Sequence, residues 1–149
     1  MISNEQRART LERALRVGLA GDPQALRELC TEDVRTWTPS SSTSSADELV
    51  AQLERRDDAF SDVSVDTTPL DVGGEWACVE WTVTMRHTGR LVLSGGTSIE
   101  ATDTAVTLHG VTVAEFAGDR ICAVRQYWDE FAVLEQLGVL VHADDAPPR

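Results

Sequence analysis

The stretch "GDRICAVRQYWDEFAVLEQLG", Gly118–Gly138, holds a turn, a strand and a helix in one short segment. The Gly-Asp pair is typical of a turn, and Arg120 to Trp128 show the period of two expected for a strand. Asp129 stands directly before an apolar helical run, where its side chain can cap free backbone N–H groups. The segment therefore predicts a strand that passes straight into a closing helix ending at Leu137.

Four further runs upstream show the same period of two. Short turns at Gly73-Gly74, Thr88-Gly89 and Thr102-Asp103 separate them. Short turns between long strands favour antiparallel pairing. The predicted strands are "VSVDTTPLDV", "EWACVEWTVTMRH", "RLVLSGGTSIEA" and "AVTLHGVTVAEF".

The N-terminal half is predicted to be mainly helical. Ser3 and Gln6 form a capping box for a first helix that ends at Gly21. Asp22-Pro23 starts a second helix, and Ser45 caps a third. Between the last two, "DVRTWTP" is predicted to be a short strand and "SSSTSS" a polar, mobile loop. Segregated helices and strands predict an α+β fold, with one bent sheet wrapped around the helices and a pocket at its open mouth.

The composition bounds the functions that the chain can have. It has 149 residues, 42% of them hydrophobic and 26% charged, which suits one domain with one core. The formal net charge of −12 repels phosphates, so we expect neither nucleic acid nor a membrane as a partner. Three cysteines without metal-ligand spacing favour reduced thiols, no metal site and a cytoplasmic location. The sequence shows neither a signal peptide nor a membrane-spanning run.

The order of these elements resembles the SnoaL-like family of the nuclear-transport-factor-like superfamily, which includes polyketide cyclases and ketosteroid isomerases. The segments that carry the resemblance are "TEDVRTWTP", "SADELVAQLERRDDAFSDVSV", "GDRICAVRQYWD" and "LEQLGV". The resemblance, which runs from about Glu5 to Val139, implies a conical fold. We expect a single domain, residues 1–141, because "HADDAPPR", residues 142–149, is typical of a frayed, disordered tail. The superfamily hosts cyclases, isomerases, dehydratases, epoxide hydrolases and non-catalytic binders, so function must be argued from the site.

The resemblance also indicates where catalytic groups would lie. In catalytic relatives the acid or base lies three residues before the aspartate at the strand end, and here that position is Gln126. A glutamine donates and accepts hydrogen bonds but does not exchange a proton near neutral pH. Epoxide hydrolases of this fold have an arginine and an aspartate where this chain has Trp81 and Val83. Neither family mechanism therefore transfers directly.

Strand alternation predicts which side chains face the cavity. If Gln126 faces inward, so does Trp128, while Tyr127 faces outward; His109 and Trp76 are also expected to point outward. An aromatic cavity with few polar groups favours a flat, apolar ligand, although bulky tryptophans could instead fill the core and leave no cavity. The predicted wall consists of Arg35, Trp37, Trp81, Val83, Met85, Leu108, Gly110, Thr112, Gln126 and Trp128.

Two functions of different classes follow. The first is a cofactor-independent enzyme of cyclase, isomerase or hydratase-dehydratase type that acts on an apolar, polyketide- or terpenoid-like metabolite of secondary metabolism. Gln126, Arg35 and Asp129 are its candidate catalytic residues, with capping as the favoured role for Asp129. The alternative is a non-catalytic module that binds a small ligand or serves in assembly. The resemblance further implies a homodimer formed through the outer sheet face, which includes Trp76 and Tyr127.

Overall fold

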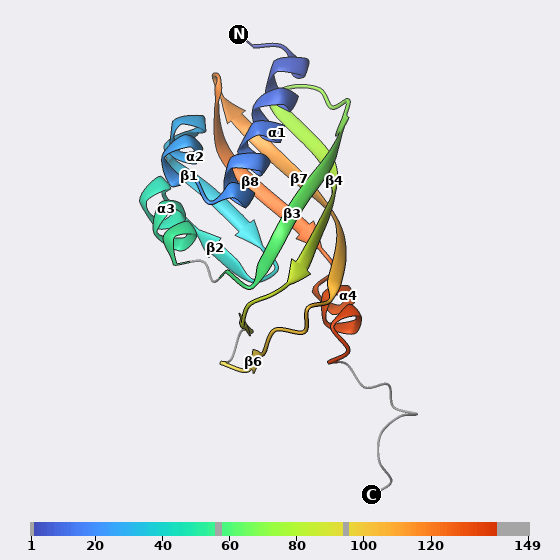
Figure 1. Ribbon diagram of the computed structural model, residues 1–149. Helices are drawn as coiled ribbons and strands as arrows, with labels where there is room; N and C mark the ends of the chain where they lie inside the picture. The colour runs from blue at the N-terminus through green and yellow to red at the C-terminus, as the bar shows by residue number, and fades with distance from the viewer. Residues whose placement is uncertain (1, 56–57, 94–95, 140–149) are drawn as a thin grey trace, which may run out of the picture.

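The computed structural model describes residues 2–55, 58–93 and 96–139 of the chain. Two helices come first in the described part of the chain, and a third follows after two strands, as the capping residues predict (Figure 1). The helix α1, Asn4–Ala20, starts at Ser3, whose hydroxyl accepts the Gln6 backbone N–H at 3.1 Å. The helices α2, Pro23–Leu29, and α3, Ala46–Glu54, start at Asp22 and Ser45 caps. The predicted domain end at residue 141 and the tail 142–149 lie outside the described residues.

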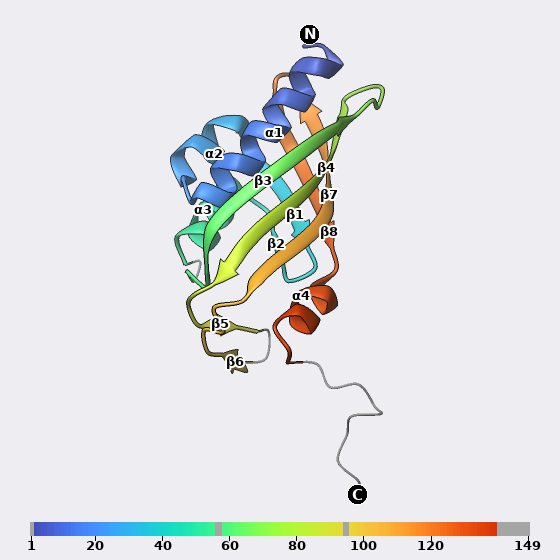
Figure 2. The same cartoon turned by 45° about the vertical axis from the view of Figure 1, so that its right-hand side comes forward.

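Six strands form one curved sheet in the order β2-β1-β8-β7-β4-β3. Neighbouring strands pair antiparallel except for β1 and β8, which run parallel. The helices α1 to α3 lie together on one face of this sheet (Figure 2). The α+β fold predicted from the sequence is confirmed. The strands are β1 (Cys30–Thr38), β2 (Ser41–Thr43), β3 (Phe60–Leu70), β4 (Trp76–His87), β7 (Ala105–Ala117) and β8 (Arg120–Trp128).

Two predicted segments differ from the structure. The serine-rich run predicted as a mobile loop contains β2, which pairs with β1 and joins it through a 2.6 Å contact between the hydroxyls of Thr36 and Thr43. The run predicted as one strand from residue 90 to 101 has only two-residue strands among its described residues. These are β5, Leu91–Val92, and β6, Ser98–Ile99, which form a separate hairpin.

The hydrophobic core fills the end of the molecule between α1, α2 and the sheet. Its fully buried side chains include Leu11 of α1, Phe116 of β7 and Ile121 of β8. Burying each such side chain contributes about 1.5–3 kcal/mol. The short helix α4, Glu130–Gln136, follows directly after β8 and its Asp129 cap. None of the described helices is both long and apolar enough to cross a membrane.

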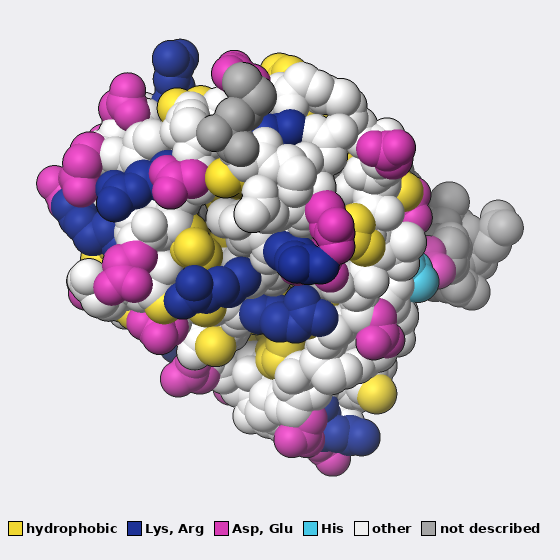
Figure 3. Space-filling model, turned by 90° about the horizontal axis from the view of Figure 1, so that it is seen from above, with side chains coloured by type: hydrophobic (Ala, Val, Ile, Leu, Met, Phe, Trp, Pro, Cys, Tyr) yellow, Lys and Arg dark blue, Asp and Glu magenta, His cyan; other side chains and the backbone are white. Residues whose placement is uncertain are grey.

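The end of the molecule at which the N-terminus lies has a mixed surface. Seen from that end, arginine and carboxylate side chains are interspersed, and hydrophobic side chains appear only as separate spots (Figure 3). The described residues seen from this end therefore form no broad apolar surface. Two exposed aromatic side chains, Trp37 of β1 and Tyr127 of β8, contact each other, with ring centroids 5.2 Å apart.

Candidate functional site: a cavity between the helices and the sheet

A cavity of about 690 Å³ lies between the helices and the inner face of the sheet. Its helical side is mostly apolar and includes Leu11, Leu15 and Leu53, with Gln52 of α3 as a polar exception. Most of its sheet side comes from alternate residues of β4, β7 and β8, which share one face because side chains alternate along a strand. The residues of these strands on the sheet side include Trp81, Val83, Met85, Leu108, Thr112, Val124, Gln126 and Trp128. Val65 of β3 and Thr36, Trp37 and Thr38 of β1 add to this side.

The strand register brings two tryptophans together in this wall. Trp81 on β4 pairs with Gly110 on β7, which in turn pairs with Trp128 on β8. The two indole rings meet with centroids 6.4 Å apart and planes tilted by 56°. Such a tilted arrangement is favourable for aromatic pairs and offers ring surface to a flat ligand.

Gly110 provides the space that the Trp81 ring needs. A Cβ atom at Gly110 would lie 2.3 Å from Trp81 Cζ2 and 2.7 Å from the backbone oxygen of Tyr127. The Trp81 indole therefore lies across the backbone of β7 where any side chain would stand. The sequence analysis predicted Gly110 as a wall residue. Gly110 lies on the inward face of β7, but it is not among the residues that line the cavity.

A small hydrogen-bonded network is built into the wall beside the tryptophans. Thr112 and Gln126 are direct partners in the β7–β8 register. The indole Nε1–H of Trp81 donates to Thr112 Oγ1 at 2.9 Å, and Gln126 Nε2 lies 3.2 Å from the same oxygen. The Thr112 side chain is fully buried, whereas Gln126 is half-buried and borders the cavity. Gln126 is therefore the polar group of this network that a ligand can reach.

A second set of polar groups lines the cavity where β1 turns into β2. The Thr38 hydroxyl lies 3.1 Å from that of Ser41, and Gln52 of α3 donates to Ser41. Ser40 also borders the cavity. Sequence reasoning missed these residues because it treated the serine run as a loop. The signal that could have found them is the alternation Thr36, Thr38, which continues the inward face of Val34.

Arg35 does not line the cavity, and its prediction as a wall residue is wrong. In the parallel pairing of β1 with β8, Thr36 lies beside the inward Val124, and Trp37 lies beside the outward Arg125. Arg35 is exposed, and Trp37 borders the cavity although its ring packs on Tyr127 and is 43% exposed. The inward face of β1 is thus shifted by one residue from the predicted one.

Asp129 lies outside the wall and caps α4. Its Oδ1 accepts the backbone N–H of Ala132 at 3.3 Å, and its side chain is exposed. His109 is also exposed and points away from the cavity, with Nδ1 3.0 Å from the Thr82 hydroxyl. Trp76 faces outward as predicted. Its ring lies beside the outward Arg125, whose guanidinium is 5.4 Å from the ring centroid.

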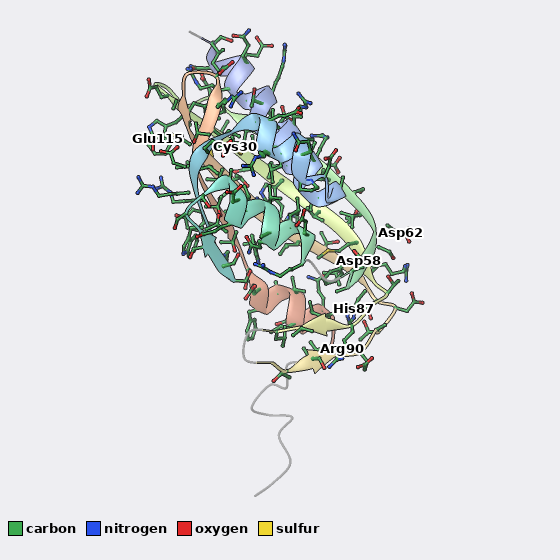
Figure 4. All side chains as sticks on the ribbon, turned by 90° about the vertical axis from the view of Figure 1, so that its left-hand side faces the viewer. Cys30, Asp58, Asp62, His87, Arg90 and Glu115 are labelled. Carbon is green, nitrogen blue, oxygen red and sulfur yellow. The ribbon has the colours of Figure 1, made fainter. Side chains whose placement is uncertain are left out.

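The titratable groups of the wall are few. Among the described residues that line the cavity there is no Asp, Glu or His; Cys30 and Arg55 are the ionisable ones. Burial raises the pKa of the Cys30 thiol to about 11, so the thiol is protonated at neutral pH. Figure 4 shows Cys30 beneath the helices, whereas the buried His87 lies near the β5–β6 end and does not line the cavity. No cluster of three or more metal-ligating side chains occurs within the described ranges.

The fold defined by this curved sheet and its helices is shared with proteins of ketosteroid isomerase-like fold. AclR, a putative hydroxylase from Streptomyces galilaeus, is 20% identical and covers 93% of this chain and 100% of its own, with a TM-score of 0.74. A putative SnoaL-like polyketide cyclase from Jannaschia sp. CCS1 is 19% identical over 97% of this chain and 95% of its own, with a TM-score of 0.75.

An LEH-like epoxide hydrolase from M. tuberculosis is 16% identical, over 90% of each chain, with a TM-score of 0.66. No curated protein matches the chain at a significant level. The model of the SnoaL-like domain matches residues 11–134, and the chain therefore belongs to the SnoaL-like family.

Proposed function

We propose that the chain is a cofactor-independent enzyme that cyclises, isomerises, hydrates or dehydrates an apolar, polycyclic metabolite of polyketide or terpenoid type. The observation that carries this proposal is the 690 Å³ cavity, whose wall combines apolar side chains with the Trp81–Thr112–Gln126 network. Cavities of this size with few, fixed polar groups are typical small-molecule sites. The three free cysteines favour a reducing compartment, so we place the enzyme in the cytoplasm.

The wall supplies binding and orientation. The indoles of Trp81 and Trp128 offer ring surface for a polycyclic ligand, and the leucines of α1 and α3 face them across the cavity. A substrate folded against this surface would react within itself, so fixing its conformation lowers the entropic part of the barrier. The Gln126 amide would orient one polar atom of the substrate.

The wall also restricts the chemistry. Without a carboxylate or imidazole among its described residues, it favours reactions driven by folding of the substrate and by stabilisation of charge on an oxygen atom. The Cys30 thiol cannot accept a proton at neutral pH, because its pKa is raised to about 11 and it is already protonated. Arg35 and Asp129, the other two candidates from the sequence, lie outside the wall, so water or the substrate itself would carry protons.

The test is turnover of a panel of polyketide and terpenoid intermediates by the purified chain. We expect at least one polycyclic ketone to be converted, with kcat/KM reduced in Gln126→Leu and unchanged in the control Arg35→Ala. Arg35 is suited as the control because its side chain is exposed and does not line the cavity. Conversion that survives Gln126→Leu and is lost in Arg35→Ala would contradict this site assignment.

A non-catalytic ligand carrier is the second candidate. The specific observation in its favour is that Gln126 stands where catalytic relatives have an acid or base, with no Asp, Glu or His in the described wall. Fluorescence of Trp81 and Trp128 reports occupancy directly, since both border the cavity. Saturable binding of ligands that are never converted would favour the carrier, and turnover would exclude it.

A further inference from the structure

The hydroxyl group of Thr112 is the centre of the wall network, and the direction of its hydrogen atom determines which end of the Gln126 amide faces it. An indole N–H can only donate, so Thr112 Oγ1 accepts from Trp81 at 2.9 Å. Among the described residues, the other partner of this oxygen is the Gln126 amide at 3.2 Å. Thr112 is fully buried, so water cannot accept its hydroxyl hydrogen.

The Gln126 amide can face Thr112 with either of its two ends. If Nε2 faces Thr112, both neighbours donate to Oγ1, and the buried hydroxyl hydrogen has no acceptor. If Oε1 faces Thr112, the hydroxyl donates to Oε1, and every group of the network is satisfied. An unmade hydrogen bond at a buried group costs enough to shift this balance by roughly tenfold or more.

We propose that Gln126 turns its carbonyl toward Thr112 and presents its NH2 group to the cavity, so that the site selects ligands with a carbonyl oxygen. Thr112 and Trp81 act as positioning residues, because Trp81 fixes Thr112 as a donor toward Gln126. This inference rests on the proposed function and names its substrate class: polycyclic ketones or quinones, in preference to hydrocarbons and alcohols.

The arrangement also has a chemical consequence. A neutral N–H donor aimed at a carbonyl oxygen stabilises the negative charge that grows on that oxygen during enolisation or ring closure. The amide transfers no proton and needs no partner of opposite charge. A glutamine at this position is thus suited to hold the oxygen of the reacting carbonyl, a task different from that of the acid or base it replaces.

The test compares three ligands of the same three-ring frame: fluorenone with a ketone, fluorenol with an alcohol and fluorene with neither. Dissociation constants come from quenching of tryptophan fluorescence. We expect fluorenone to bind roughly 3- to 12-fold more tightly than fluorene, the value of one net hydrogen bond, with fluorenol between them. The infrared carbonyl stretch of bound fluorenone should move to lower frequency.

Variants of the network identify its members. Gln126→Leu and Thr112→Val should each remove the preference for fluorenone over fluorene and the infrared shift. Thr112→Ser keeps the hydroxyl and should restore both. The matched controls are Gln24→Leu, on the exposed side of α2, and Thr82→Val, on the outward face of β4; both should behave like the parent chain.

Each contrary result has one meaning. Equal binding of fluorenone and fluorene, or tighter binding of fluorenol than of fluorenone, would overturn the amide orientation and leave the proposed cavity function standing. A shift that persists in Gln126→Leu would also overturn it. Failure of all three ligands to bind would overturn the inference together with the proposed function. Melting curves of each variant separate loss of the network from loss of the fold.

Discussion

At the residue scale, Gly110 determines how Trp81 sits in the cavity wall. The pairing of Trp81, Gly110 and Trp128 across three strands places two large rings on either side of a position without a side chain. The same register sets Thr112 beside Gln126. The ring surface and the polar network of the site therefore depend on one small residue.

Gly110→Ala should destabilise the chain and disturb the network. The added Cβ would lie 2.3 Å from the Trp81 ring and close to backbone, so Trp81 must move away from Thr112. We expect a loss of about 1–3 kcal/mol in the free energy of unfolding, measured with urea. Gly73→Ala is the control, because no atom lies within 4 Å of its added Cβ. Equal stability of the two variants would show that Trp81 does not occupy this space.

Cys30 should make the fold sensitive to alkali. Its pKa in the folded chain is raised from 9.0 to about 11 by burial, so between these values the unfolded chain binds fewer protons than the folded one. Stability is then fully present below pH 9 and falls as pH rises toward 11, by about 2 kcal/mol. Cys30→Ala should be less stable at pH 7 and lose less between pH 9 and 11. Parallel pH profiles for the two chains would exclude this role of the thiol.

At the scale of elements, the passage from β8 into α4 could be predicted closely from the sequence. The period of two ends at Trp128, and the cap at Asp129 is the one observed. The helix then docks on β7 through Gln136, whose amide exchanges two hydrogen bonds of 2.8 Å with the backbone of Thr107. Local signals suffice here because period and cap agree.

The inward face of β1 could not be predicted in the same way. Val34 and Trp37 are both apolar but point to opposite faces of β1. The sequence analysis assigned the larger residue, Trp37, to the inner face, whereas Val34 occupies it. The deciding fact is the parallel pairing with β8, a contact between segments far apart in the sequence. β2 was missed for a similar reason, since its stability comes from pairing with β1 and not from its serine-rich composition.

Substitutions of Asp129 separate capping from catalysis. Asn caps nearly as well as Asp, so Asp129→Asn should keep the melting temperature and any turnover. Asp129→Ala removes the acceptor for the Ala132 N–H and should cost about 0.5–2 kcal/mol of stability. Both variants are measured for melting and for turnover. A stable but inactive Asn variant would move the catalytic centre to Asp129.

At the scale of the whole molecule, the sheet separates two surfaces with different properties. The inner face borders the cavity, whereas the outer face carries the Trp37–Tyr127 and Trp76–Arg125 contacts. Trp37 and Tyr127 are 43% and 45% exposed, which is unusual for large aromatic side chains on a sheet. We propose that a second copy of the chain covers this face.

The proposed homodimer is tested by light scattering at micromolar concentration. We expect twice the chain mass, and a shift toward the single-chain mass in Tyr127→Arg, which places a further charge beside Arg125. Gln24→Leu, on the far side of the sheet, is the control and should leave the mass unchanged. A parent chain with the mass of one copy would refute the dimer.

The most direct test of the central claim is whether filling the cavity abolishes ligand binding. Met85 lines the cavity on β4, and Met85→Trp would occupy part of its 690 Å³. We expect fluorenone to quench the tryptophan fluorescence of the parent chain saturably, with one ligand per chain, and to bind Met85→Trp at least roughly tenfold more weakly while the far-ultraviolet circular dichroism is unchanged. Equal affinity for both chains, or no saturable binding by the parent, would contradict the assignment of this cavity as the ligand site.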